Sequence, residues 1–274
     1  IEKLQNKKLG YFLKNVISKS PYYIDLFKKN KIKLSEIKTV SDLRKIPFTT
    51  KKDIIASERF IIKNGKPVHV HFTAGRTAAP TPFFYTEYDL NNLKEVGKRL
   101  FNVFKADKKD IAVNAFPYAP HLAFWQSYFA LNAVGILALH SGGGKVLGTE
   151  KIIRSAAGMK ATTILGMPGY VYHLLRIAKE EKINLSSVNK VILGGERVDK
   201  GLKEKLRSFL GNKARILSTY GFTEGKCVWG QCSEDSGYHL YPDLEFIEVV
   251  DKNGENVGEG EKGVYGQKLE SSVY

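Results

Sequence analysis

Apolar residues recur along this chain with two periods, one typical of helices and one typical of strands. In the first 30 residues the spacing is helical and predicts helices over 3–18 and 21–30, the second starting at Pro21. Two short strand-like segments then follow, 68–70 and 83–85, with a loop over 71–81 between them, which predicts a hairpin over 68–86. A further helix is expected from 87 to about 104.

From residue 111 onward, short apolar runs alternate with helical patterns. The expected strands are 111–116, 136–139, 162–166, 190–193 and 215–218, and the expected helices are 121–134, 149–158, 168–181 and 199–210. Such repeated units predict an α/β fold, with a mostly parallel sheet covered by helices on both faces. Near the C-terminus, the run 246–251 followed by Gly254 predicts a hairpin that starts a second, antiparallel element.

Polar and glycine-containing segments follow the predicted strands. These segments are 117–121, 141–144, 167–169, 194–196 and 220–224. In a doubly wound sheet, ligands bind at the carboxyl ends of the strands. Because all five segments are expected at that edge, the sequence predicts one ligand site there.

The segment 219–224 reads Thr-Tyr-Gly-Phe-Thr-Glu and combines four useful chemical groups. Tyr220 offers a face for stacking a purine, and Gly221 permits a tight turn. Thr223 offers a hydroxyl for phosphate, and Glu224 offers an oxygen ligand for Mg²⁺. This combination indicates nucleotide chemistry.

Two further segments agree with that interpretation. Hydroxyl and amide groups in 71–81 lie between two predicted strands and can surround polyphosphate oxygens, although an ordinary hairpin turn has a similar composition. A Walker A motif cannot be placed there. In 194–196, Gly-Gly-Glu follows an apolar strand, and the paired glycines allow a base to approach the backbone closely.

In order and separation, these segments resemble the adenylate-forming superfamily, specifically its phenylacetate–CoA ligase branch. The loop 73–82, the Gly-Gly-Glu segment 194–196 and the Tyr-Gly-Phe-Thr-Glu segment 220–224 match its signatures. Further similarity lies in 20–23, 46–53, 141–143, 237–239 and 248–251, so the resemblance covers almost the whole chain. It implies a reaction in which ATP activates a carboxylate as an acyl adenylate and coenzyme A receives the acyl group.

The resemblance also implies roles for individual residues. The β- and γ-phosphates of ATP would contact Thr73, Gly75, Arg76 and Thr77, and the adenine would contact Gly194, Gly195, Glu196, Tyr220 and Gly221. Thr223 would contact the α-phosphate as a catalytic residue. Glu224 would act in catalysis by binding Mg²⁺.

Two departures from the family pattern affect this expectation. Ala78 and Ala79 stand where the family usually has Gly and Lys, with Arg76 as a substitute cation. The chain also stops at Tyr274, before the Arg-x-Asp segment and the C-terminal lid of the family. The implied organisation is an α/β adenylation core with a helical lead-in over 1–236 and the beginning of a β subdomain over 237–274, with the lid absent. The sequence is either a portion of a longer protein or a shortened relative.

The expected carboxylate site uses the aromatic run 116–125. Tyr118, His121, Phe124 and Gly142 are the candidate substrate-binding residues, and a flat apolar slot suits an aryl or small acyl carboxylate. The alternative is that Phe124, Trp125, Tyr128 and Phe129 form a buried helix stripe and that His121 only caps the helix or is solvated.

Cys227, Cys232 and His239 are candidate zinc ligands. Three ligands do not complete a structural zinc site, and the cysteine spacing is looser than Cys-x2-Cys, so two reduced thiols are the alternative. In some relatives of the branch this segment carries metal-binding Cys and His.

The formal net charge of +15 raises the question of nucleic-acid binding. The lysines are dispersed, as on solvated helix faces, so no nucleic-acid partner is expected; an anionic nucleotide benefits equally from a positive field. No apolar run approaches the roughly 20 residues of a membrane span, and the start does not follow a signal-peptide pattern. A cytoplasmic protein is therefore expected. The sequence leaves open whether two copies of it form a homodimer.

Three functions remain distinct at this point. The first is the CoA ligase just described. In the second, the acyl adenylate goes to a carrier-protein thiol, or AMP goes to another acceptor. The third is a nucleotide- or ligand-binding module without catalysis, suggested by Ala78, Ala79 and the absent lid.

Overall fold

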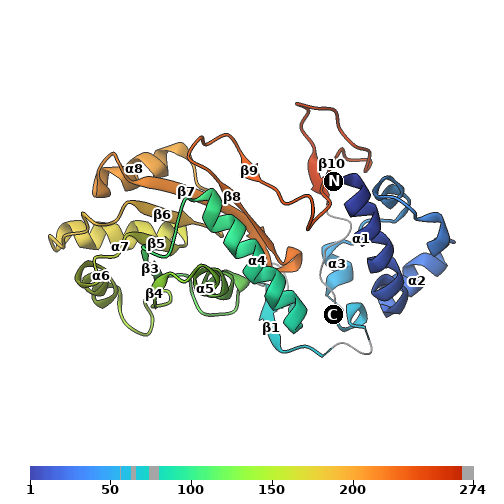
Figure 1. Cartoon of the computed structure of the whole chain (residues 1–274), viewed down its shortest axis with the longest axis horizontal. Helices are drawn as coiled ribbons and strands as arrows, with labels where there is room; N and C mark the ends of the chain where they lie inside the picture. Colours follow the sequence, from blue (N-terminus) through green and yellow to red (C-terminus); the bar gives the residue numbers. More distant parts are fainter. Residues whose placement is uncertain (56, 63–65, 74–79, 267–274) are drawn as a thin grey trace. The chain divides into compact units, whose positions relative to one another are not determined.

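The computed structural model describes residues 1–55, 57–62, 66–73 and 80–266 (Figure 1). Contacts divide the chain into two compact units. One contains 1–70, 77–89 and 240–274, and the other contains 71–76 and 90–239. The helical lead-in is thus grouped with the C-terminal segment, where the sequence grouped it with the core. The expected domain division itself stays a prediction.

The first unit contains the helical lead-in. Its elements are α1 (Glu2–Asn15), α2 (Pro21–Lys29), α3 (Lys51–Ile54) and the 3-10 helices Ile17–Lys19, Leu34–Glu36, Val40–Lys45 and Ser57–Phe60. Leu13, Ile17 and Leu43 lie in its buried core, against which Phe246 packs. The Gln5 side chain also donates to the Pro242 carbonyl at 2.8 Å. These contacts explain why the lead-in groups with residues after 240.

Two further strand pairs lie outside the large sheet. β1 (His69–Phe72) pairs with β2 (Pro82–Tyr85), as the predicted hairpin requires. β10 (Glu248–Val250) pairs with β11 (Val264–Gly266). The antiparallel element is therefore confirmed. The residues just after Gly254 form only an isolated bridge, between Val250 and Asn256, and the strand that pairs with β10 is β11, further along the chain.

The second unit is built on a seven-stranded sheet. Its strands are β3 (Ile111–Asn114), β4 (Leu137–His140), β5 (Thr163–Gly166), β6 (Lys190–Leu193), β7 (Arg215–Phe222), β8 (Cys227–Gln231) and β9 (Tyr238–His239). The strand order is β4-β3-β5-β6-β7-β8-β9, parallel from β4 to β7 and antiparallel beyond. The α/β fold with a mostly parallel sheet is confirmed.

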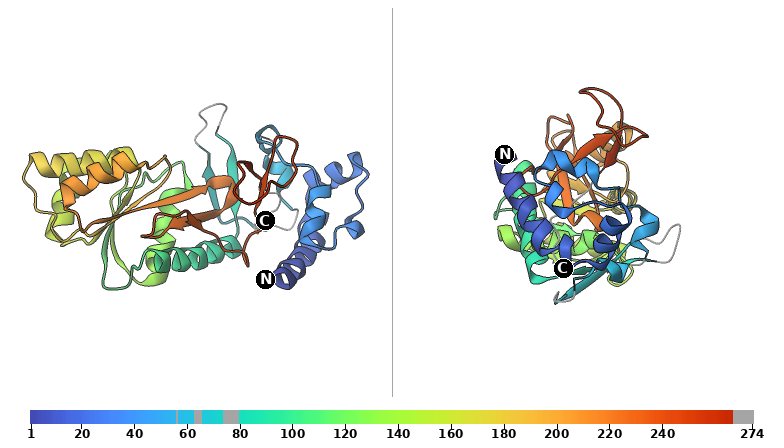
Figure 2. Two further views of the ribbon diagram at one scale, coloured as in Figure 1. Left: turned by 90° about the horizontal axis from the view of Figure 1, so that it is seen from above. Right: turned by 90° about the vertical axis from the view of Figure 1, so that its right-hand side faces the viewer.

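Helices cover both faces of this sheet, as Figure 2 shows. The helices are α4 (Glu87–Val103), α5 (Leu122–Val134), α6 (Thr149–Gly158), α7 (Pro168–Glu180) and α8 (Lys200–Leu210). Side chains alternate along each strand. Ile164 therefore lies in the core with α6, α7 and α8, whereas its neighbour Leu165 lies in the core with α4 and α5. Within the described residues, no helix is long and apolar enough to span a membrane.

The strand order reverses beside β3. The chain passes from β3 outward to β4 and then crosses back to β5 on the other side of β3. The loops after β3 and β5 consequently lead to α5 and α7 on opposite faces. A doubly wound sheet binds ligands at such a reversal, so the region between these loops is the expected location of a site.

The strand β7 extends further than the sequence indicated. It continues to Phe222 and pairs with β8, with Tyr220 opposite Trp229. The expected turn at Gly221 is therefore wrong. Glycine is needed there for close packing, because a Cβ would lie 2.7 Å from the Cys227 carbonyl oxygen.

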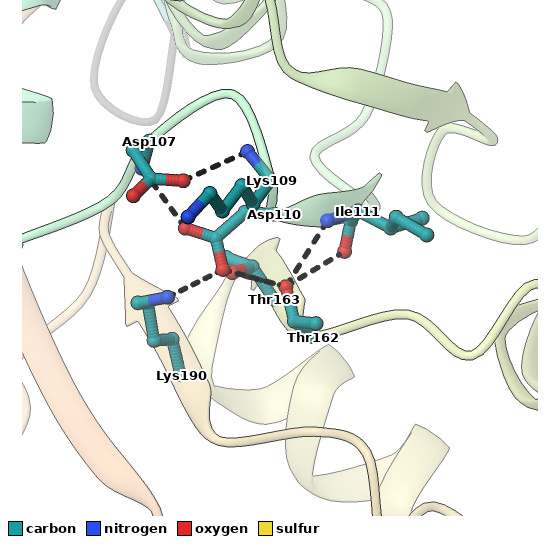
Figure 3. A network of polar contacts seen from close by, with 7 residues as sticks. All are labelled: Asp107, Lys109, Asp110, Ile111, Thr162, Thr163 and Lys190. Carbon is teal, nitrogen blue, oxygen red and sulfur yellow. Dashed lines mark hydrogen bonds and ion pairs between the residues drawn. The ribbon is translucent and has the colours of Figure 1, made fainter.

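A buried ion pair holds three strands at the opposite edge of the sheet (Figure 3). Lys190, at the start of β6, donates to Asp110, which directly precedes β3. The Thr162 hydroxyl donates to the same carboxylate at 2.7 Å and accepts the Ile111 N–H at 3.1 Å. Buried charges require such partners, so this network fixes the register of β3, β5 and β6.

Candidate functional site

The carboxyl ends of the four central parallel strands are level with one another. Asn114 of β3 pairs with Leu165 of β5, and Leu193 of β6 pairs with both Gly166 and Ser218. The segments after β3, β4, β5 and β6 therefore leave the sheet at one edge. The segment 220–224 differs, because residues 220–222 continue in β7. That these segments form one ligand site stays a prediction.

Gly194 and Thr219 bring two of these strand ends into close contact. The Thr219 hydroxyl donates to the Leu193 carbonyl at 3.0 Å. A Cβ at residue 194 would lie only 2.3 Å from that hydroxyl oxygen, and Gly195 has a φ of +83°. Glycine is thus required at both positions, for different reasons.

Glu196 connects the loop after β6 to the loop after β5. Its carboxylate accepts the Gly169 N–H at 3.3 Å, in the first turn of α7. A carboxylate is favourable at a helix N-terminus, where backbone N–H groups lack partners. Glu196 therefore positions the loop that was predicted to contact adenine.

Tyr220 provides an aromatic surface beyond the end of β6. Its ring lies on Trp229, with centroids 5.6 Å apart and planes 17° from parallel. Trp229 is 2% exposed, whereas Tyr220 is 47% exposed. Tyr220 lies two residues past Ser218, about 7 Å along the strand. Its ring can accept a flat base while Trp229 supports it from below.

The two predicted catalytic residues lie on the turn between β7 and β8. Thr223 is buried and Glu224 is half-buried, both in the 3-10 helix Thr223–Gly225. Thr223 is five residues past Ser218, so roughly 16 Å of extended strand separates it from the end of β6. The structure places these residues further from the Gly194 loop than Tyr220. Their roles stay predictions.

The predicted phosphate loop begins beside the end of β3. The Phe72 N–H donates to the Pro120 carbonyl at 3.0 Å, and the His71 ring lies 6.4 Å from that of Trp125. Thr73 therefore follows a backbone segment anchored at this edge. The other loop residues named above, Gly75, Arg76, Thr77, Ala78 and Ala79, lie outside the described residues.

Three of the four candidate substrate residues meet at the ends of β3 and β4. The Tyr118 hydroxyl donates to the His140 carbonyl at 2.6 Å, and its ring lies 4.4 Å from that of Phe124. Gly142 has a φ of +70°, and a Cβ there would lie 2.4 Å from the Tyr118 ring. The absence of a side chain at Gly142 therefore leaves the space that the Tyr118 ring occupies.

The fourth candidate, His121, directly precedes α5 and is half-buried. Its side chain makes no capping hydrogen bond, which leaves a solvated side chain as the alternative to substrate binding. Phe124 also packs into the core below α5, as the buried-stripe alternative expected. One residue therefore contributes both to the core and to the aromatic cluster with Tyr118.

His140 was not among the predicted site residues. Its ring lies 4.9 Å from Tyr128 and 5.9 Å from Phe124, and its Nδ1 is 3.4 Å from the Asn114 amide nitrogen. Burial lowers the pKa of His140 below its ordinary value of 6.5, which favours the neutral ring. The sequence signal that could have identified His140 is its position as a polar residue directly after the apolar run 136–139.

The predicted zinc ligands are spread along and beside strand β8 and do not meet at one point. Cys227 begins β8 and Cys232 directly follows it, so roughly 16 Å of extended strand lies between them. His239 is opposite Gly230 near one end of that strand. The described part of the chain contains no group of three His, Cys, Asp or Glu residues able to hold a metal. The zinc prediction is therefore wrong for these three residues.

Comparison with protein families gives one match that covers most of the chain. The family model described as AMP-binding enzyme matches residues 17–265. The phenylacetate-coenzyme A ligase of Escherichia coli (strain K12) is 24% identical over 273 residues, which are 96% of this chain and 61% of that protein. The enzyme of the same name from Thermus thermophilus is 26% identical, over 95% of this chain and 60% of that protein. The chain thus spans about 60% of the length of these relatives.

Solved structures show the same fold. A 2-hydroxyisobutyryl-CoA ligase in complex with 2-HIB-AMP and CoA superposes with a TM-score of 0.89 at 20% identity, over 99% of this chain and 60% of that one. The same ligase in an open conformation has a TM-score of 0.86 at 19% identity, over 99% of this chain and 62% of that one. This likeness shows that the chain has the fold of the N-terminal part of such ligases.

Proposed function

Because the chain belongs to the family of AMP-binding enzymes, we propose that it supplies the nucleotide- and carboxylate-binding part of an adenylate-forming acid–thiol ligase. The carrying observation is that the Gly194 backbone directly follows β6, while the exposed Tyr220 ring lies on the neighbouring strand β7, two residues beyond its last pair with β6. A purine needs a close backbone for its edge and an aromatic surface for its face.

The proposed reaction has two steps, and each step forms one bond and breaks one bond. A carboxylate oxygen attacks the α-phosphorus of ATP, and pyrophosphate leaves with the electrons of the broken phosphorus–oxygen bond. The thiolate of coenzyme A then attacks the acyl carbon, and AMP leaves. Positioning and charge stabilisation provide most of the catalysis in such transfers.

In this proposal the residues of the first step come from the loop after β6, from β7 with the turn that follows it, and from the loop after β1. Tyr220 and the loop 194–196 hold the base, and the Thr223 hydroxyl donates to the α-phosphate. The loop that begins at Thr73 holds the outer phosphates. The dispersed positive charge of the chain, formally +15, favours approach of these anions.

The turn between β7 and β8 offers a ligand that suits Mg²⁺. Glu224 is a half-buried carboxylate on that turn, and Mg²⁺ binds one or two carboxylates together with water and phosphate oxygens. Glu224 would provide one oxygen. When bound, the ion would neutralise charge on the phosphates.

The carboxylate is an aryl or small acyl acid. Tyr118 and Phe124 form an aromatic cluster beside the end of β3, and His121 precedes α5 at the same edge. The names of the relatives, phenylacetate-coenzyme A ligase and 2-hydroxyisobutyryl-CoA ligase, support a carboxylate of this size and coenzyme A as the acceptor.

Exchange of labelled pyrophosphate into ATP tests the proposal. The whole protein that carries this chain would be assayed with phenylacetate, benzoate and 2-hydroxyisobutyrate, each with and without Mg²⁺. Exchange that requires both a carboxylate and Mg²⁺ is expected. Exchange that proceeds without any carboxylate would contradict carboxylate activation.

A further inference from the structure

The sheet face that carries α6, α7 and α8 also carries an aromatic cluster beyond α8. Tyr220 and Trp229 face each other across β7 and β8, and Tyr238 of β9 is opposite Gln231. The Tyr238 ring centroid lies 6.0 Å from that of Tyr220, at an angle of 47°. Tyr220 therefore contacts Trp229 on one side and Tyr238 on another.

The hydroxyl of Tyr238 is anchored below this cluster. It lies 2.9 Å from the Ser218 hydroxyl oxygen, and Ser218 is 3% exposed. Ser218 is also the last residue of β7 to pair with β6. Tyr238 is thereby connected to the strand end at which the Gly194 loop begins.

A second contact fixes the segment that leads into β9. Lys203 of α8 is 4% exposed; it donates to the Gln231 side chain at 2.7 Å and pairs with Asp235. A strand of two residues has little stability of its own. The position of Tyr238 consequently depends on these side-chain contacts as well as on its ladder.

The geometry excludes a base between the two tyrosines. A stacked base needs rings that are nearly parallel and about 7 Å apart, which is two contacts of about 3.5 Å. Tyr220 and Tyr238 are closer than this and tilted. The exposed part of the Tyr220 ring is the surface that remains for a base.

We propose that Tyr238 is a positioning residue for the nucleobase: anchored by Ser218, it fixes the orientation in which the Tyr220 ring receives a purine. The inference rests on the proposed nucleotide site. It adds a specificity-determining residue from β9, outside the segments that the sequence associated with ATP.

Calorimetric titration of this chain tests the role, with AMP and GMP as ligands and tripolyphosphate as a probe of the phosphate site. Tyr238→Ala should weaken AMP binding about tenfold and reduce the preference for AMP over GMP, with tripolyphosphate affinity unchanged. Tyr11→Ala, at an exposed tyrosine on α1, is the matched control. A loss of stability alone would not change base preference.

A double-mutant cycle separates the anchor from the ring. Tyr238→Phe and Ser218→Ala each remove the same hydrogen bond, so each should weaken AMP binding two- to threefold, and the double variant should lose no more than either. Folded Tyr238→Ala with wild-type AMP affinity and base preference would overturn the inference alone. Wild-type protein that binds no nucleotide would overturn it together with the proposed function.

Discussion

The Thr219 hydroxyl occupies the space that a side chain at Gly194 would need. It donates to the Leu193 carbonyl at 3.0 Å, and a Cβ at residue 194 would approach it to 2.3 Å. Two neighbouring strand ends are thus joined by one short side chain and one missing side chain. The contact sets how closely the 194–196 backbone lies to the candidate base site.

Gly194→Ala should therefore displace the Thr219 hydroxyl and weaken AMP binding by about tenfold, roughly 1.4 kcal/mol. The double variant Gly194→Ala/Thr219→Ala should recover part of this loss, because the next atom from the new Cβ is 3.5 Å away, on Phe116. Gly158→Ala, where a Cβ meets nothing within 4 Å, is the control. Unchanged AMP affinity in Gly194→Ala would remove the 194–196 loop from the site.

Gly142→Ala should affect the carboxylate site and leave the nucleotide site intact. The new methyl group would push the Tyr118 ring from the His140 carbonyl. We expect the affinity advantage of an acyl adenylate analogue over AMP to fall about tenfold, with AMP affinity unchanged. Calorimetry with both ligands measures this.

Gly143→Ala is the matched control for that experiment. Its nearest neighbour would be a Pro117 carbon at 3.6 Å, an ordinary contact, and its backbone is not left-handed. Equal losses for the two ligands in Gly142→Ala would indicate general damage to the edge and would contradict a separate acyl site.

Glu224→Gln should slow pyrophosphate exchange by about a hundredfold or more, about 3 kcal/mol, on the scale of one lost charge contact in a transition state. Glutamine keeps the size of the side chain and removes its charge. The exposed Glu259, changed to Gln, is the control. Wild-type exchange in Glu224→Gln would exclude this residue as the Mg²⁺ ligand.

Acid stability should report the buried pair of Asp110 and Lys190. Burial raises the pKa of Asp110, but hydrogen bonds from Lys190 and Thr162 outweigh it and hold that pKa below its ordinary value of 3.8. The stabilisation is therefore complete above pH 3.8 and is lost as the pH falls through the lower pKa of the folded state.

Asp110→Asn should remove this acid dependence and reduce the free energy of unfolding at pH 7 by roughly 3–5 kcal/mol, because Lys190 stays buried without a counter-charge. Urea unfolding between pH 3 and 7 measures both effects. Asp25→Asn, in an exposed pair with Arg59, should cost about 1 kcal/mol or less. Similar costs for the two variants would contradict the structural importance of the buried pair.

Much of the sheet could be predicted because the hydrophobic pattern within each segment identifies its strand or helix locally. The strand at 190–193 and the helix at 149–158 have the predicted bounds, since an apolar run and an amphipathic pattern identify each one locally. The strand β8, from Cys227 to Gln231, was not predicted. Pairing with β7, which buries Trp229, determines that structure instead.

Contacts between distant segments could not be predicted. Nothing near Tyr238 indicates that its hydroxyl meets Ser218, twenty residues earlier, because that contact depends on the register of β8 and β9. Tyr220 illustrates the intermediate case. Its residue type pointed to base stacking, but its place within a strand and on Trp229 needed the structure.

Titration of this chain with a non-hydrolysable acyl adenylate, compared with AMP, tests the central claim most directly. An adenine site at Tyr220 and an acyl site at Tyr118 on one sheet edge predict that both ligands bind and that the acyl adenylate binds more tightly, with Tyr220→Ala weakening both and Gly142→Ala weakening only the acyl adenylate. Failure of the well-folded chain to bind either ligand would contradict an adenylate-forming site at this edge.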